Sequence, residues 1–468
     1  MVVNPYQPQE TEAASATPGT GLPSASLPDA AASPAVAASE VSPRERLTVW
    51  VLWWVYGAFY FCRTNLSVAV PGMQKSLALG GLGLTGTETG SILASLKLTY
   101  GIGQLINGQL AEHVSPRRLL GLGMLASAGM NLLFGLSAGF YTLLVIWAAN
   151  GYFQSLGWTP CVRVVGNWVP AQRRGKAIGI LGTGYQVTQG LTYLVAGYSA
   201  QYLGWRGAVY VPAAILAASG VFMLAILRDS PADQRLSDER KSDKRDAGAR
   251  REHAGQAGPR NSLAQTLILT ISNPALWLLG IALGLLNACR YGFVDWGVAH
   301  LTEVQDIGIG KAALNYVVLA IGGVAGSYLT GWITDRFFGG RRSPAICTLL
   351  VLLAVLTLLY ERAAQTSAVA TIILLMLIGF CVFGPQVLLV GTAPADLARR
   401  GTPAAAAGFV NFLGYMGAAL GDKVTGYYKD HEGWQVAIYI WAGWALAAAV
   451  AAAMLWNAKP KADETSKA

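Results

Sequence analysis

WVLWWVYGAFYFCRTNLSVAV at Trp50–Val70 and LWLLGIALGLLNACRYGFVDW at Leu276–Trp296 are the two stretches that decide the predicted fold. Each is about as long as the roughly 20 residues that a helix needs to cross a bilayer. Each also contains one arginine directly after a cysteine, Arg63 in the first and Arg290 in the second, 227 positions apart. Because a charged guanidinium inside a bilayer is costly, such an arginine usually faces a cavity, a counter-charge or an anionic ligand. The matching positions therefore predict an anion site between two repeated halves.

The composition of the whole chain is typical of a membrane protein. Hydrophobic residues make up 53% of the 468 residues and charged residues only 13%, whereas a soluble domain has about 25% charged residues. The net charge of +9 does not indicate nucleic-acid binding, because the basic residues lie in short loops between apolar blocks. No cofactor or metal site is expected, since the cysteines and histidines lack metal-ligand spacing. No nucleophile–base pattern indicates an enzyme.

Apolar blocks predict twelve membrane-spanning helices in two sets of six. The first set is expected at 47–71, 89–112, 118–138, 141–168, 176–200 and 207–227, and the second at 274–300, 313–334, 344–361, 368–393, 404–427 and 433–457. The expected domains are an N-terminal half at 45–228 and a C-terminal half at 266–457. A disordered tail at 1–44, a charged linker at 229–265 and a tail at 458–468 complete the chain.

The loop charges predict the orientation of these helices. Lys and Arg lie just before the first span, at Arg44 and Arg46, and are concentrated in the linker and in the loops after helices 2, 4, 8 and 10. Cytoplasmic loops carry an excess of Lys and Arg. Both termini and the linker are therefore expected on the cytoplasmic side of the cell's inner (plasma) membrane.

Two loops occupy corresponding positions in the two halves, GQLAEHVSPRRLL at Gly108–Leu120 and GWITDRFFGGRR at Gly331–Arg342. They resemble the cytoplasmic signature of the major facilitator superfamily, whose repeated halves enclose a substrate site near the bilayer midplane. The resemblance implies that an acid and the arginines after it join neighbouring helix ends. The expected gating residues are Glu112, Arg117, Arg118, Asp335 and Arg336.

Further segments resemble the organophosphate:phosphate antiporter family of that superfamily. They are YGAFYFCRTNLSVAVP (56–71), NGYFQSLGWTPCVRVVGNWVPAQRRGKA (150–177), CRYGFVDWGVAHL (289–301), GFCVFGPQVLLVGTAPADLA (379–398) and AAAAGFVNFLGYMGAAL (404–420). The resemblance covers nearly all of residues 47–457, and the sequence is similar to bacterial glycerol-3-phosphate and hexose-phosphate transporters and to eukaryotic glucose-6-phosphate carriers. It implies an all-α polytopic membrane protein, with twelve transmembrane helices in two pseudo-symmetric halves.

The same resemblance implies roles for individual residues. Arg63 and Arg290 match the arginines that hold the phosphate in this family, and Asp295 matches an aspartate that balances charge beside the site. The tyrosines that line or close the cavity are matched by Tyr56, Tyr60 and Tyr415.

Three positions depart from the family pattern. Tyr185 replaces a histidine, and Thr64 and Gln104 each replace a lysine. Lys97 lies seven residues before Gln104, on roughly the same helix face, so it could supply a missing cation to the cavity. The alternative is a lysine that extends to the membrane interface. These changes leave the exact substrate and any proton involvement open.

Other charged and aromatic residues in the spans allow two interpretations. Asp422 is a candidate counter-charge for an arginine or Lys97, and the adjacent Lys423 points in a different direction, so either could face the cavity. Trp158 could line the substrate path or simply pack. Arg163 is expected to act in gating or at the interface.

These residues predict a secondary transporter that exchanges a phosphorylated metabolite, a sugar phosphate or glycerol-3-phosphate, for inorganic phosphate. An arginine fork can bond two phosphate oxygens, so a bound phosphate would draw the halves together during a rocker-switch movement. Two alternatives stay open: a membrane sensor of the same family, and an ion-coupled symporter of organic carboxylates, because CRTNLSVAVP (62–71) also resembles a segment of that family. We expect a monomer that has no nucleic-acid partner.

Overall fold

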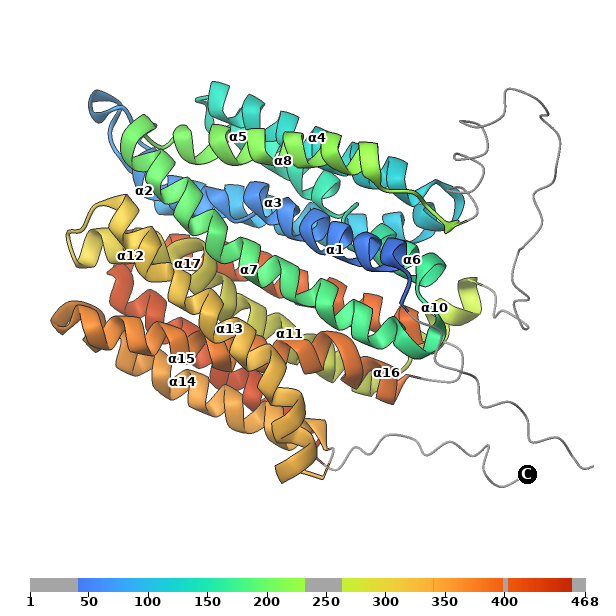
Figure 1. Ribbon diagram of the computed structural model, residues 1–468. Helices are drawn as coiled ribbons and strands as arrows, with labels where there is room; N and C mark the ends of the chain where they lie inside the picture. The colour runs from blue at the N-terminus through green and yellow to red at the C-terminus, as the bar shows by residue number, and fades with distance from the viewer. Residues whose placement is uncertain (1–40, 232–262, 340, 399–402, 457–468) are drawn as a thin grey trace, which may run out of the picture. The chain divides into compact units, whose positions relative to one another are not determined.

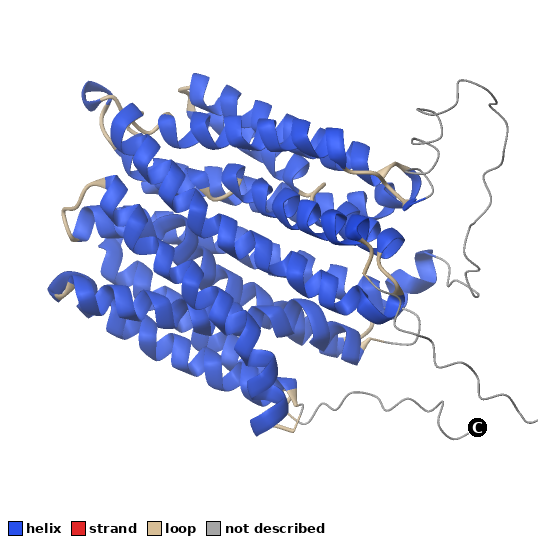
Figure 2. Ribbon diagram, viewed as in Figure 1, coloured by secondary structure: helices blue, strands red, loops and turns tan. Residues whose placement is uncertain are grey.

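The structure is a computed structural model that describes residues 41–231, 263–339, 341–398 and 403–456. All regular secondary structure in these ranges is helical (Figure 2). Residues 1–40 of the predicted tail, residues 232–262 of the predicted linker, and the C-terminal tail lie outside the described residues.

The first six spans include two that are broken. Span 1 consists of α1 (Pro43–Ala58), η1 (Phe59–Cys62) and α2 (Asn65–Gln74), and a short η2 (Leu77–Leu79) lies in the loop after it. Span 4 consists of α5 (Phe140–Gln154) and α6 (Trp158–Trp168). The other spans of this half are α3 (Gly86–His113), α4 (Pro116–Leu136), α7 (Ala171–Leu203) and α8 (Gly207–Ile226). The continuous helix predicted over 141–168 is wrong at residues 155–157. Pro160 has no backbone N–H and suits the first turn of a helix, so a new helix begins at Trp158.

The second six spans begin after a short helix, α10 (Leu263–Ile271). They contain α11 (Pro274–Tyr291), the π-helical turn η3 (Gly292–Trp296) and α12 (Gly297–Val304); then α13 (Ile309–Phe337), α14 (Arg342–Thr366), α15 (Ala368–Val387) with η4 (Leu388–Thr392) and α16 (Ala393–Leu397), and α17 (Pro403–Ala453). The last two predicted spans are joined within α17, which turns sharply at Gly433. That residue has a φ of 81°, a backbone conformation that glycine adopts without steric cost.

Seven helical stretches of the described chain are long and apolar enough to cross a membrane by themselves: Pro116–Leu136, Gly207–Ile226, Pro274–Val304, Ile309–Phe337, Arg342–Thr366, Ala368–Gly391 and Ala405–Ala453. The last of these contains both final spans. Spans 1 and 4 fall short because they are broken into shorter helices. Helix α3 is not among these stretches, because it contains the polar residues Lys97, Gln104 and Asn107. These side chains bond to residues of other spans.

In the described chain, the two halves meet mainly along three helix pairs. Helix α3 packs against α17, α7 against α13, and α2 against α12 (Figure 1). Small residues permit close approach at these contacts. A Cβ atom on Gly197 of α7 would lie 2.6 Å from the Cβ of Ala313, and one on Gly90 of α3 would lie 2.5 Å from the carbonyl oxygen of Asp422. The close α3–α17 contact brings charged residues from both halves together at mid-helix.

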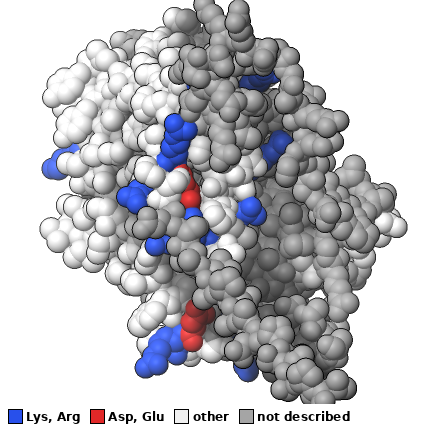
Figure 3. Space-filling model, turned by 45° about the vertical axis from the view of Figure 1, so that its right-hand side comes forward, with Lys and Arg blue, Asp and Glu red and all other residues white. Residues whose placement is uncertain are grey.

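The two ends of the helices differ in charge and in packing. At the end where α10 and α16 lie, named here the α10 end, Lys and Arg side chains outnumber acidic ones on the face that Figure 3 turns forward. Cβ atoms on Gly175, Gly179 and Gly182 of α7 would contact nothing within 4 Å. At the opposite end, where α2 and α12 lie, described polar side chains connect the halves. This α12 end is therefore held closed, whereas these α7 glycines face open space toward the α10 end.

Candidate functional site

The helix break in span 1 positions Arg63. After η1, the N–H groups of Arg63 and Thr64 both bond to the carbonyl of Tyr60, at 3.2 and 3.1 Å. The carbonyl of Cys62 instead accepts a hydrogen bond from Asn150 Nδ2 of α5 at 2.9 Å. Because a side chain of another helix satisfies this backbone group, the break is stable inside the protein. It turns Arg63 toward the interior, where it is buried.

Neutral acceptors hold the Arg63 guanidinium. Its Nε donates to Gln154 Oε1 at 3.2 Å, and its Nη1 donates to the Tyr60 hydroxyl at 3.3 Å. Gln154 is itself fixed, because its Nε2 donates to Ser127 Oγ at 2.8 Å and to the carbonyl of Phe59 at 3.0 Å. No acidic side chain among the described residues forms an ion pair with Arg63. Its positive charge is therefore positioned but not neutralised.

Aromatic rings surround this arginine. The ring centroid of Tyr100 lies 4.1 Å from Arg63 Cζ, and Tyr415 of α17 packs on Tyr100 at 4.4 Å. Tyr60 stacks on Tyr185 with their centroids 5.1 Å apart. Sequence analysis missed Tyr100, although it precedes the glycine of the YG pair from which Gln104 was counted. Tyr56 and Trp158 extend the same wall, with ring centroids 4.9 Å apart.

Arg290 reaches the same region from the second half. It lies at the end of α11, directly before η3, and π-helical turns of this kind are frequent at functional sites. Its Cζ lies 4.6 Å from the ring centroid of Tyr291 and 4.9 Å from that of Phe383. Its buried Nε has no hydrogen-bond partner, and no carboxylate of the described chain pairs with it. Tyr185 lies 6.4 Å from Phe383, so aromatic rings connect the two arginines across the halves.

Asp295 of η3 pairs with Lys97 and not with Arg290. The Lys97 ammonium contacts Asp295 in a close ion pair and lies 2.6 Å from Asp422 Oδ2. The three side chains are at most 4% exposed. The contact with Asp422 is close but not aligned as a hydrogen bond, and Asp422 Oδ1 has no partner at all. Lys97 thus connects α3 with η3 and α17, and it is buried in the interior instead of extending to the membrane interface.

The comparisons with known proteins agree with this architecture. A family model for the Major Facilitator Superfamily matches residues 52–421. The chain belongs to this superfamily. Among solved structures, a bacterial homologue of the human lysosomal transporter Spinster, inward-facing and occupied, superposes with a TM-score of 0.70. It is 15% identical and covers 88% of this chain and 97% of its own, so it establishes the shared fold.

Relatives with more similar sequences narrow the family. A probable hexose phosphate transport protein of Chlamydia trachomatis is 29% identical, over 86% of this chain and 89% of its own. The glycerol-3-phosphate transporter of Bacillus subtilis is 28% identical over 87% and 91%, and the membrane sensor protein UhpC of Escherichia coli is 30% identical over 80% and 83%. These matches confirm the resemblance to the organophosphate:phosphate antiporter family. This major facilitator is therefore a multi-pass membrane protein and not an enzyme.

Two residues predicted for the site of this major facilitator, Gln104 and Lys423, are not paired with either arginine or with Lys97 in the described chain. Gln104 donates to the carbonyl of Ser155 at 3.3 Å, inside the first half, and does not reach the arginines. Lys423 is exposed and is not part of the Lys97 cluster. Arg163, which was expected in gating or at the interface, bonds to the carbonyl of Val114 at 3.2 Å, near the α10 end.

The predicted gating loops are only partly joined. Arg117 donates through its backbone N–H to Asp229 Oδ1 at 2.7 Å and through its side chain to the carbonyl of Leu224, so it holds α4 to the end of α8. The side chain of Glu112 lies outside the described residues. Two of the predicted residues, Asp335 and Arg336, are exposed, as is Arg118. None of these three forms an ion pair within the described chain.

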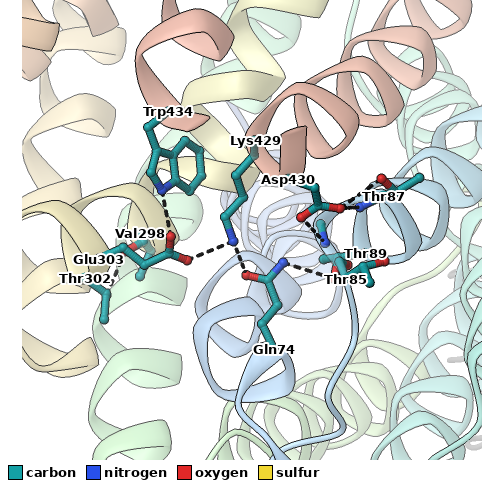
Figure 4. Close-up of polar contacts among 11 residues, drawn as sticks. Gln74, Thr85, Thr87, Thr89, Val298, Thr302, Glu303, Lys429, Asp430 and Trp434 are labelled. Atoms are coloured by element: carbon teal, nitrogen blue, oxygen red, sulfur yellow. Dashed lines mark hydrogen bonds and ion pairs between the residues drawn. The ribbon is translucent and has the colours of Figure 1, made fainter. Parts of the chain in front are cut away.

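A polar connection that the sequence did not suggest joins the halves at the α12 end. Asp430 of α17 accepts hydrogen bonds from Gly86 N at 2.8 Å, Thr87 N at 2.7 Å and Thr87 Oγ1 at 2.9 Å (Figure 4). The next residue back, Lys429, lies 2.9 Å from Glu303 Oε1 of α12.

The same Lys429 donates to Gln74 Oε1 of α2 at 2.6 Å, and Trp434 Nε1 donates to Glu303 Oε2 at 2.7 Å. We name these residues the α12 clasp: Gln74, Gly86, Thr87, Glu303, Lys429, Asp430 and Trp434. They form two adjacent sets of polar contacts, one at Lys429 and one at Asp430, which join α2 and α3 to α12 and α17 (Figure 4). Sequence analysis assigned Lys429 no role at this site, because contacts of α17 with α2 and α12 have no local sequence signal.

Proposed function

We propose that this protein is a secondary transporter that exchanges a phosphorylated small metabolite for inorganic phosphate. The observation that carries the proposal is the pair of buried arginines, Arg63 and Arg290, one from each half, neither of which has a carboxylate partner among the described residues. Uncompensated guanidinium groups inside a membrane protein are expected to face an anionic ligand. A phosphate monoester fits because each planar guanidinium can bond two of its oxygens.

The surrounding rings support an ester with a small organic group. Tyr60, Tyr100 and Tyr185 present flat apolar surfaces together with hydroxyl groups, which suits a sugar or glycerol carbon chain that carries its own hydroxyls. The names of the relatives point the same way, since they are a hexose phosphate transport protein, a glycerol-3-phosphate transporter and a sensor. We therefore place sugar phosphates and glycerol-3-phosphate first among candidate substrates.

Charge and packing suggest how transport proceeds. With the α12 clasp formed and open space beside the α7 glycines toward the α10 end, we infer a state open toward the α10 end. The excess of basic residues at that end favours its being cytoplasmic, with both termini there, in a bacterial inner membrane. An empty site keeps two arginine charges apart, whereas a bound phosphate attracts both and lowers the cost of bringing the halves together. Exchange is then faster than return of the empty carrier.

Counterflow in liposomes tests this proposal. The purified full-length chain is reconstituted with internal phosphate, and uptake of radiolabelled phosphate is followed, with glycerol-3-phosphate and glucose-6-phosphate as competitors. Native protein should exchange label rapidly, and Arg63→Lys or Arg290→Lys should lower the rate at least tenfold, because lysine keeps the charge but loses the fork. Lys423→Gln, on the exposed face of α17, is the matched control and should exchange normally.

The outcomes separate the candidate functions. Binding of these esters without movement of label would favour a sensor, which the 30% identity with UhpC makes a specific alternative. Neither binding nor exchange of phosphate would refute the proposal and make organic carboxylates the next substrates to assay.

A further inference from the structure

We propose that each phosphate dianion crosses together with one proton, and that Asp422 holds this proton. The inference rests on the proposed function, because it concerns the same site. Asp422 is completely buried in α17, and one of its two carboxylate oxygens, Oδ1, has no partner. A buried carboxylate oxygen without a hydrogen-bond donor is costly, and binding a proton removes the charge that causes the cost.

The neighbours of Asp422 strengthen the argument. The charged groups that face it are Lys97 of α3 and Asp295 of η3, which share one ammonium between two carboxylates. Two carboxylates in one buried site do not readily both stay ionised. η3 also turns the indole of Trp296 toward Asp422, although its Nε1 forms no well-aligned hydrogen bond, and α11 presents the backbone and methyl of Ala288 to the adjacent Gly421.

Two other polar side chains of the second half, His300 and Thr425, already form hydrogen bonds with other residues. His300 of α12 hydrogen bonds to Tyr360 of α14 at 2.8 Å, and Thr425 accepts from Trp441 Nε1 at 2.9 Å. Among the described residues, only Lys97 therefore supplies a positive charge to Asp422. Lys97 lies closer to Asp295 than to Asp422, so the negative charge of Asp422 is the one that Lys97 neutralises less completely.

The charge balance of the whole site gives the stoichiometry. Arg63, Arg290 and Lys97 are positive, and Asp295 and Asp422 are negative, so the empty site carries one net positive charge. A phosphate dianion would leave one net negative charge at the middle of the membrane, which is unfavourable. One proton on Asp422 makes the loaded site neutral. Loading with a dianion and protonation of Asp422 should therefore occur together.

A shared ring provides the connection between substrate and proton. The Tyr291 ring lies 4.8 Å from Lys97 Nζ and 4.6 Å from Arg290 Cζ. A dianion bound at Arg290 would thus sit one ring away from Lys97 and attract its ammonium. Because the contact between Lys97 and Asp422 is not aligned as a hydrogen bond, it is the weaker of the two ion pairs and the first to loosen. Asp422 then takes up the proton.

The test measures protons taken up when ligand binds. Isothermal titration of the purified full-length carrier with glycerol-3-phosphate is run at pH 8 in buffers with different ionisation enthalpies. A phosphate monoester has a second pKa of about 6, so the free ligand is a dianion at this pH. Native protein should take up about one proton for each ligand bound, and Asp422→Asn should take up none while it still binds. Asp422→Asn keeps the Lys97–Asp295 pair, so it should fold; Asp422→Leu is a second variant of similar size.

Each result has a distinct meaning. Uptake that persists in the Asp422 variants would place the proton on the phosphate or on Asp295 and overturn the assignment. Binding without proton uptake in native protein would overturn the coupling and leave the phosphate transporter standing. Absence of both binding and counterflow would instead refute the proposed function. Lys423→Gln, one residue away but exposed, should behave as native.

Discussion

Replacing Asp430 with alanine should release the α12 end of the carrier. Its carboxylate accepts three hydrogen bonds from Gly86 and Thr87 across the two halves. The site is partly exposed, so each bond contributes at the low end of the usual range, about 0.5 kcal/mol net. Their loss should destabilise the closed α12 end by about 1.5 kcal/mol, which corresponds to a roughly tenfold change in the ratio of open to closed molecules.

The start of helix α3 should survive this change, because it has a cap of its own. Thr85 Oγ1 accepts from Glu88 N at 3.1 Å, and Glu88 Oε2 accepts from Thr85 N at 2.9 Å, which together form a capping box. Asp430→Ala should therefore shift the gate without unfolding the helix. Glu88→Ala is the matched control: it removes a cap inside one half and should lower thermal stability while leaving the gate closed.

Pulsed electron spin resonance measures the gate directly. Spin labels replace Leu79 in the first half and Glu432 in the second, both exposed at the α12 end. The background carries Cys347→Ser, since Cys347 is the only one of the five cysteines that is not buried. Asp430→Ala should increase the long-distance population about tenfold relative to the short one. An unchanged distance distribution, in a variant with native thermal stability, would show that Asp430 does not hold the gate.

Three further predictions follow from the site. Tyr100→Ala, which removes the ring beside Arg63, should weaken phosphate binding by about tenfold in titrations, whereas Tyr100→Phe should keep most of the affinity. Gln154→Ala should lower thermal stability by roughly 1–3 kcal/mol of unfolding free energy, since it leaves buried partners unsatisfied, and thermal melts of the purified protein would detect this. Lys97→Gln should be among the most destabilising changes, at about 3–5 kcal/mol, because it strands two buried carboxylates. Adding Asp422→Asn to Lys97→Gln should recover part of that loss in the same melts; no recovery would mean that the two charges do not interact.

Much of the fold was predictable from the sequence because membrane spans are long and apolar. The positions of Arg63 and Arg290 in those spans indicated a shared interior site, and the structure links them through aromatic rings. The breaks were harder to predict. The turn before Arg63 depends on Asn150 satisfying the carbonyl of Cys62, 88 residues earlier in the chain, and no local pattern encodes such a contact.

Contacts between the halves were the least predictable part. The sequence suggested Asp422 as a partner for Lys97 or an arginine, and the structure shows the Lys97 contact. The sequence could not show that Asp295 would pair with Lys97 as well, because that prediction requires knowing that α3 lies against η3. The α12 clasp was missed for the same reason: Lys429 and Asp430 look like ordinary loop charges until α17 is placed beside α3.

The turn at Gly433 has a consequence for how fast this carrier can work. Lys429, Asp430 and Trp434 lie within a few residues of the turn, and α17 continues on both sides of it without an intervening loop. At this turn, α17 therefore contains no flexible loop that could move independently of its helices. Separation at the α12 end must therefore tilt two whole helices through the lipid at once, against the viscosity of the bilayer. Turnover should then depend on membrane fluidity, and a covalent tether across this end should arrest the cycle completely.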